Sequence, residues 1–140
     1  MALDVPTPAA VNEFFAREFP GAYDGGYRSV ESAPGVAVAR WTYDARALRP
    51  GGLISGATQF ALADLSLWFL TFTVLGLAPM AVTSELSIAY LRPAMGGDLL
   101  ARAELLRAGK AKIVGTVRLW VDGAPDKIVS HVTGSYMRLG

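Results

Sequence analysis

ISGATQFALADLSLWFLTFTVLG, at residues 54–76, is the stretch that decides how this chain folds. Its positions are apolar almost all the way round a helix, so such a helix has to be surrounded by protein or lipid. One carboxylate, Asp64, lies near its middle. A buried carboxylate is costly unless it has a partner or a chemical task. The stretch therefore predicts a buried central helix over about 54–76 and makes Asp64 the first candidate for function.

The composition predicts one ordinary domain, residues 1–140, with an apolar surface. Hydrophobic residues make up 52% of the chain and charged residues 18%, so we expect another subunit to cover part of it. A net charge of +1 and scattered basic residues argue against a nucleic-acid partner. The chain contains no cysteine, which excludes disulfide and thiolate chemistry and fits a cytoplasmic location.

The apolar stretch also raises the alternative of a membrane span. Residues 60–82 have the length of a bilayer-spanning helix. Against a span, Asp64 would lie inside it, Gly76 and Pro79 would interrupt it, and its flanks lack the usual basic anchors. The first residues lack a basic segment followed by an apolar one, so no signal peptide is expected. A buried helix in a soluble protein is favoured, with no membrane partner.

Shorter patterns predict the elements on either side of the central helix. Thr7 can cap a helix that Pro8 begins, and phenylalanines recur at helical spacing, which predicts a first helix over about 7–19. Glycine and proline predict a loop over 21–35 and a turn at 49–52. Alternation with a period of two predicts strands at 36–43, 82–91, 98–107, 111–121 and 127–139.

The strand predicted at 82–91 should place its even-numbered residues, from Val82 to Tyr90, on one face. Short connections such as 107–110 and 122–123 make the strands that they join antiparallel. A helix that is apolar all round is buried only if such a sheet curls around it. The predicted fold class is therefore α+β, with an antiparallel sheet wrapped around one long central apolar helix whose open side something else must close.

Five motifs occur in order along the chain: GGLISG at 51–56, ALAD at 61–64, TSELSIAYLRPA at 83–94, GDLLARA at 97–103 and SHVTGSY at 130–136. Together they resemble the hotdog-fold acyl-CoA thioesterases, and most closely the phenylacetate-pathway (PaaI-like) branch. The resemblance covers roughly 36–139. It implies a hotdog fold, a homodimer that can pair into a tetramer, and hydrolysis of acyl-CoA thioesters to a free acid and coenzyme A.

The resemblance also implies a catalytic site. In this branch a glycine at the start of the central helix offers its N–H to the thioester carbonyl, and the matching residue is Gly56. An acidic residue two turns on, here Asp64, activates water or attacks directly. A hydroxyl residue at the start of the next strand helps to hold the water; Thr83 matches, with Ser84 beside it. No cofactor is implied, because coenzyme A is part of the substrate, and no metal-ligand spacing is present.

Helix geometry makes it difficult for one chain to complete this site. The N–H groups at a helix start suit a carbonyl oxygen that gains negative charge. However, Gly56 and Asp64 are separated by roughly 12 Å along the helix axis, at about 1.5 Å per residue. One thioester carbon cannot reach both. A two-fold dimer, in which Gly56 of one protomer faces Asp64 of its partner, would form two composite sites and cover the open side of the helix.

The chain departs from the family pattern just before the central helix. The usual Asn and His positions of the motif are occupied by Arg49 and Ser55, which are therefore candidates for contact with the substrate. Ser55 can still cap the helix, and donation by the Gly56 backbone needs neither side chain. Gln59 and Trp68 are further candidates for the substrate pocket or the core. The basic residues beside a predicted hairpin are candidates for binding the phosphates of coenzyme A: Arg107, Lys110 and Lys112.

Each candidate also has a structural interpretation, and two other functions remain open. Asp64 could be a buried acid bonded to a partner helix, and Gly56 could serve only a tight helix entry. The loss of the family Asn and His favours a non-catalytic acyl-CoA or lipid-binding protein. A hydratase or dehydratase pairs a His with an acid near the helix, so Ser55 argues against it. The only histidine, His131, is expected to be a structural or surface residue of the last strand rather than a general base.

Overall fold

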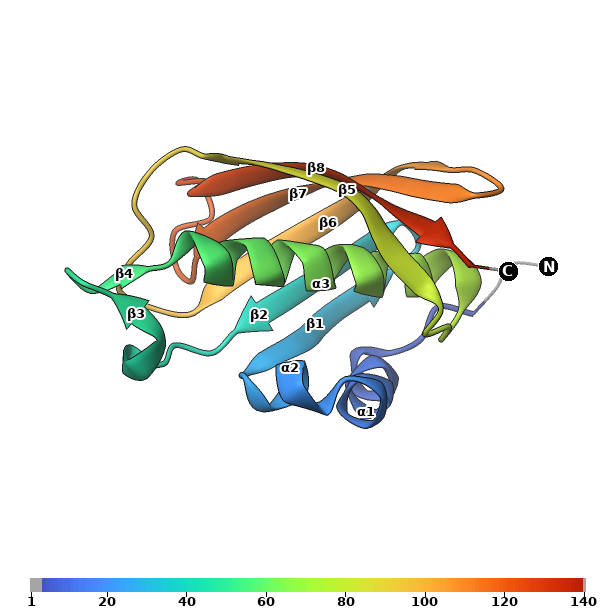
Figure 1. Ribbon diagram of the computed structural model, residues 1–140, viewed down its shortest axis with the longest axis horizontal. Coiled ribbons are helices and arrows are strands. Elements are labelled where there is room, and N and C mark those ends of the chain that lie inside the picture. The colour runs from blue at the N-terminus through green and yellow to red at the C-terminus, as the bar shows by residue number, and fades with distance from the viewer. Residues whose placement is uncertain (1–3, 140) are drawn as a thin grey trace.

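The central helix α3 (Gly56–Leu75) lies in the concave side of an antiparallel sheet that curls around it (Figure 1). The computed structural model describes residues 4–139. Ser55 caps the helix, since its side-chain oxygen accepts from the Thr58 N–H at 3.1 Å. Gly76, with φ of 77°, follows its last residue. The helix predicted over 54–76 is confirmed, and two-thirds of its most apolar window (67%) is buried in the fold, as for a core helix.

The main sheet has the strand order β1-β2-β6-β7-β8-β5, with every neighbouring pair antiparallel. Its strands are β1 (Tyr27–Ala33), β2 (Val36–Trp41), β5 (Ala81–Tyr90), β6 (Leu99–Ala108), β7 (Lys112–Val121) and β8 (Ser130–Arg138). A short hairpin precedes α3, formed by β3 (Leu48–Arg49) and β4 (Leu53–Ile54). The predicted α+β hotdog fold, a sheet wrapped around one long helix, is confirmed.

The loop predicted over 21–35 is wrong, because that segment contains α2 (Pro20–Asp24) and the edge strand β1. The turn-forming residues mark the two ends of β1 rather than one continuous loop: Gly26 (φ 90°) precedes it and Gly35 (φ 72°) follows it. Between them, the sequence YRSVESA shows no apolar alternation. A bulge at Val30 also interrupts the pairing of β1 with β2.

The strands after α3 do not all pair in sequence order. The hairpins β6–β7 and β7–β8 are as predicted, but β5 pairs with β8 and not with β6. The connection over residues 91–98 is long enough to pass the start of α3, where the Ile54 N–H donates to the Ala94 carbonyl at 2.8 Å. The strand β2 takes the place beside β6. As a result, β5 is an edge strand in the chain, with one side unpaired.

Two glycines let α3 lie close against the sheet. Gly115 of β7 and Gly134 of β8 are directly paired, and both face the helix. A Cβ at Gly134 would lie 2.6 Å from Leu67 Cδ1, and one at Gly115 would lie 2.8 Å from Leu70 Cδ2. Side chains at these positions would therefore push the helix away from β7 and β8.

The helix α1 (Pro8–Glu18) closes one end of the core. Thr7 caps it by accepting from the Ala10 N–H at 3.1 Å, which confirms the helix predicted over about 7–19. Its Phe15 packs edge-on against Phe69 of α3, with the ring centroids 5.3 Å apart. The other side of α3 is left open: Ala57 is exposed and Phe60 is 39% exposed.

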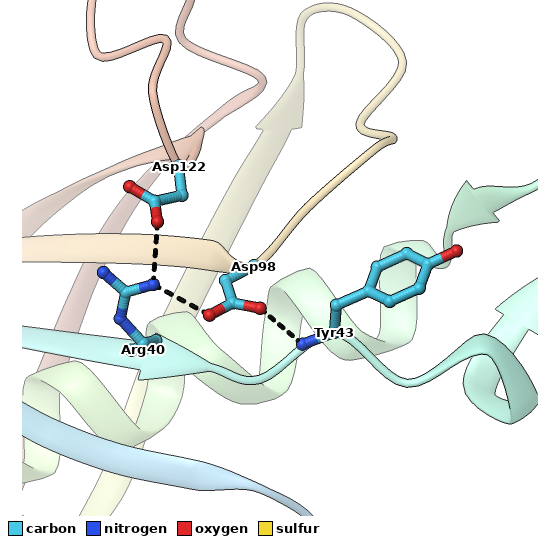
Figure 2. Close-up of polar contacts among 4 residues, drawn as sticks. All are labelled: Arg40, Tyr43, Asp98 and Asp122. Carbon is cyan, nitrogen blue, oxygen red and sulfur yellow. Dashed lines mark hydrogen bonds and ion pairs between the residues drawn. The ribbon is translucent and has the colours of Figure 1, made fainter.

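An ionic cluster joins the neighbouring ends of three inner strands, β2, β6 and β7 (Figure 2). Arg40 Nη1 lies 2.8 Å from Asp98 Oδ2 and 3.0 Å from Asp122 Oδ2. The other oxygen of Asp98 accepts from the Tyr43 backbone N–H at 2.7 Å. The hydrogen bond from the Tyr43 N–H lowers the pKa of Asp98 below its ordinary value of 3.8, and Arg40 lowers it to a smaller extent. The Gly-Asp motif at 97–98 therefore has a structural role in this chain.

Replacing Asp98 with Asn should destabilise the protein at neutral pH by about 1–2 kcal/mol, because the bond to a charged partner is weakened. The folded-state pKa of Asp98 is lowered, so its contribution is complete above the ordinary value of 3.8 and is lost as the pH falls through the folded-state value. Thermal unfolding from pH 7 to pH 3 should therefore show a smaller acid-induced fall in Tm for the variant. An equal fall in both proteins would contradict this role; Asp126→Asn at an exposed turn serves as control.

Candidate active site

Two hydroxyl groups hold the side chain of Asp64. Thr83 Oγ1 donates to Asp64 Oδ1 at 2.7 Å, and the Tyr136 hydroxyl lies at 2.7 Å from the same oxygen. The Tyr136 hydroxyl also lies 3.0 Å from the Asp64 backbone carbonyl. Among residues 4–139, no hydrogen-bond donor to Asp64 Oδ2 is present. One carboxylate oxygen is thus fixed, while the other remains available to a water molecule or a substrate.

A β-bulge brings Thr83 to Asp64. The pairing of β5 with β8 shifts between Thr83 and Glu85, so Ser84 is the extra residue. Because of this shift, Thr83 lies opposite the helix-facing Tyr136, while Val82 is 42% exposed. The regular alternation predicted from Val82 onward is therefore wrong at the start of the strand. The predicted proximity of Thr83 to Asp64 is present in the structure, whereas Ser84 has no contact with Asp64 among the hydrogen bonds of the site.

Tyr136 was not among the residues that the sequence suggested. Burial raises its pKa, and the negative charge of Asp64 raises it further, so the phenol stays protonated and remains a donor. Its position near the end of the SHVTGSY motif, on the helix-facing side of β8, is the only signal in the sequence. That signal does not identify a partner on α3, because the contact depends on how the sheet curls.

Asp64 lines a mainly apolar cavity of about 340 Å³, which lies between the end of α1, the helix α3 and the start of β5. The polar residues that line it are Glu18, Asp64, Thr83 and Tyr136, of which the last three are joined by hydrogen bonds. The remaining lining is apolar: Phe19, Leu65, Trp68, Pro79, Ala81 and Val82. Trp68 is thus a wall residue of this cavity. An apolar cavity with a polar group at one edge suits an acyl chain.

Gly56 lines a different cavity, of about 460 Å³, near the start of α3. Two residues predicted to contact substrate, Arg49 and Gln59, line this cavity with it. Its other walls come from the segments before and after: Leu53, Ile54, Tyr90, Leu91, Arg92, Pro93 and Ala94. Asp64 lines only the first cavity of the two. Within one chain, the predicted carbonyl-binding group and the predicted base therefore face separate cavities.

The start of α3 has free hydrogen-bond donors. Ser55 accepts from the Thr58 N–H through its side chain at 3.1 Å and from the Gln59 N–H through its carbonyl at 3.2 Å. In the described part of the chain, no acceptor takes the N–H of Gly56 or of Ala57. Free N–H groups at the positive end of a helix dipole can stabilise an oxygen that becomes negative.

Most of the remaining candidates do not line either cavity. Gln59 is 4% exposed; its Nε2 donates to the Ile54 carbonyl at 3.3 Å, and no partner is present for its Oε1. The exposed His131 faces away from α3. The three predicted phosphate-binding residues are exposed on or beside the β6–β7 hairpin and line neither cavity: Arg107, Lys110 and Lys112. Over residues 4–139, no group of three potential ligand side chains could hold a metal ion.

Comparison with known proteins places this geometry in a family. A model of the thioesterase superfamily matches residues 51–126. Among solved structures, a candidate thioesterase from Silicibacter sp. is 32% identical, with a TM-score of 0.87, over 97% of this chain and 94% of its own. The E. coli PaaI protein from the phenylacetic acid degradation operon is 25% identical, with a TM-score of 0.79, over 98% of this chain and 97% of its own.

A variant of the phenylacetic acid degradation protein PaaI from Thermus thermophilus is 27% identical, with a TM-score of 0.73, over 86% of this chain and 99% of its own. No curated protein sequence matches the chain. The family model covers more than half of the chain, and the Silicibacter structure aligns over nearly all of it. The chain therefore belongs to the thioesterase superfamily.

Proposed function

We propose that this protein hydrolyses acyl-CoA thioesters to a free acid and coenzyme A, with each active site shared by two copies of the chain. The observation that carries the proposal is the Asp64 carboxylate, held by Thr83 and Tyr136 at the edge of an apolar cavity with one oxygen free. Membership of the thioesterase superfamily supports the reaction class. A cytoplasmic location is part of the proposal, because acyl-CoA substrates are found inside cells.

The proposed reaction is attack by water on the thioester carbonyl. The Gly56 N–H of one protomer binds the carbonyl oxygen and stabilises the negative charge that develops on it. Asp64 of the partner subunit takes a proton from the water as its oxygen bonds to the carbonyl carbon. The tetrahedral intermediate then collapses, the carbon–sulfur bond breaks, and the proton passes to the departing thiolate. We favour this general-base role over direct attack because the Thr83 hydroxyl can also accept a hydrogen bond from the water.

The composite arrangement is supported by what one chain leaves exposed. Gly56 and Asp64 face separate cavities on the same open side of α3. Apolar side chains surround that side, including Phe60 at 39% and Leu91 at 59% exposure. A two-fold dimer would bury these side chains and bring Gly56 of each chain opposite Asp64 of the other. Pairing of two such dimers into a tetramer is a further part of the proposal.

Coenzyme A would lie on the Gly56 side of the site, with its acyl group in the apolar cavity of the partner. Arg49 and Arg92 line the Gly56 cavity, and neither has a carboxylate within ion-pair distance in residues 4–139. Guanidinium groups without partners are suited to phosphate oxygens. We therefore place these two arginines beside the hairpin set, Arg107, Lys110 and Lys112, as candidates for the phosphates of coenzyme A.

A second candidate function is binding of acyl-CoA without turnover. It is favoured by Ser55 and Arg49 at the positions where the family motif has His and Asn. Ser55 is occupied as a helix cap, so it does not replace a histidine in the cavity. Backbone donation by Gly56 is unaffected, and for this reason hydrolysis remains the preferred proposal.

Release of free thiol from a panel of acyl-CoAs tests the proposal. The panel should include short, medium and aryl acyl groups, because the size of the apolar cavity does not select one of them. We expect release of coenzyme A from at least one member, at a rate proportional to the concentration of the protein. Binding of these compounds in calorimetry without any thiol release would support the binding protein instead.

A further inference from the structure

The last residue of the edge strand β5, Tyr90, is in contact with the first residue of α3. Its hydroxyl donates to the Gly56 carbonyl oxygen at 2.9 Å. Its ring lies against the Gly56 α-carbon, since a Cβ built there would be 3.0 Å from both Cζ and the hydroxyl oxygen of Tyr90. Both residues line the same cavity. A side chain at position 56 would therefore require the Tyr90 ring or the helix start to shift.

The backbone of Gly56 does not itself require glycine. The glycines with positive φ do not include Gly56, so an L-residue could adopt its backbone conformation. What disfavours a side chain at position 56 is the close contact with the tyrosine ring. Most helix starts are fixed only by a cap, and Ser55 already caps this one. Tyr90 adds a contact from the sheet to the carbonyl of Gly56, which belongs to the peptide unit that carries the Ala57 N–H; both this N–H and that of Gly56 are free.

Folding alone does not account for the hydroxyl of Tyr90. The residue is 52% exposed, so water could satisfy its hydroxyl, and an exposed hydrogen bond contributes little net stability. We propose that Tyr90 is a positioning residue, which holds Gly56 at its carbonyl and its α-carbon so that the Gly56 N–H points at the thioester carbonyl. This inference rests on the proposed function, in which that N–H binds the carbonyl oxygen. It assigns to Tyr90 a role in kcat rather than in substrate affinity.

The first test is Tyr90→Phe, which removes the hydroxyl and keeps the ring. We expect kcat for the best acyl-CoA substrate to fall roughly tenfold while KM changes by less than about twofold, because only transition-state stabilisation is weakened. Tm should be nearly unchanged. The matched control is Tyr43→Phe, another exposed tyrosine, which should keep the kcat of the parent protein. An unchanged kcat in Tyr90→Phe would overturn the inference, as would a proportional rise in KM.

The second test introduces Gly56→Ala into two backgrounds. With Tyr90 present, the methyl group displaces the ring or the helix start, and kcat should fall on the order of 100-fold. In the Tyr90→Ala background the methyl group has room, so Gly56→Ala should change the already reduced kcat by less than about twofold. Equal fold losses in both backgrounds would overturn the inference, because the two residues would then act independently.

These outcomes can be separated from failure of the proposed function. If the parent protein hydrolyses no acyl-CoA, the hydrolysis proposal fails, and thermal unfolding of the same four proteins still measures the contact. The close contact between Tyr90 and Gly56 predicts that Gly56→Ala lowers Tm only when Tyr90 is present. If hydrolysis is observed but kcat is indifferent to Tyr90→Phe, the positioning role alone is contradicted.

Discussion

Replacing Asp64 with Asn should remove most thioester hydrolysis and leave the fold intact. The amide is nearly the same size as the carboxylate, and its carbonyl oxygen can accept from Thr83 and Tyr136 as Asp64 Oδ1 does. The amide cannot take a proton from water, so the general base is lost. We expect kcat/KM to fall by about 10²-fold or more, as for the loss of a general base. Thiol release with the best substrate measures this.

Two measurements show that the loss is chemical. The circular dichroism spectrum and Tm of Asp64→Asn should remain close to those of the parent protein, because the hydrogen bonds around the side chain are retained. A carboxylate of similar chemistry elsewhere provides the control: Glu13→Gln on the exposed side of α1 should retain full activity. If Asp64→Asn retained turnover comparable to the parent protein, the base would have to be another residue, and the proposed mechanism would fail.

The sequence was sufficient to predict the parts of the fold that depend on local pattern. The apolar run at 54–76 requires a buried helix, and the polar exception within it identified Asp64. The cap at Ser55 follows from the identity of the residue before the helix. The segment containing β1 was missed because an edge strand with mixed polarity and a bulge has no two-residue alternation.

The details of the site depended on long-range geometry that pattern cannot supply. Thr83 reaches Asp64 only because a bulge at Ser84 changes which side chains face the helix. Tyr136 reaches the same carboxylate from β8, although 71 residues separate the two in the chain. The contact of Tyr90 with Gly56 depends on where the edge strand ends relative to the helix start. None of these is a periodic signal, so sequence reasoning named Thr83 by resemblance and missed both tyrosines.

Mixing two variants, one altered at Gly56 and the other at Asp64, provides the strongest test of the shared active site. A chain with Asp64→Asn keeps Gly56 and lacks the base, and a chain with Gly56→Ala keeps Asp64 and has a disturbed carbonyl-binding group. Each variant alone should be nearly inactive. In a dimer of one chain of each kind, one composite site combines two altered residues and the other combines two intact ones. Mixing the two inactive proteins should therefore restore hydrolysis.

The size of the recovery follows from counting. After unfolding and joint refolding of equal amounts, half of the dimers contain one chain of each kind, and each of these has one working site out of two, which gives about a quarter of the parent rate per chain. Thiol release before and after mixing measures this recovery, with each variant refolded alone as the control. If each site lay within a single chain, every site in the mixture would still carry one altered residue. No recovery would then be seen, and the shared site would be ruled out.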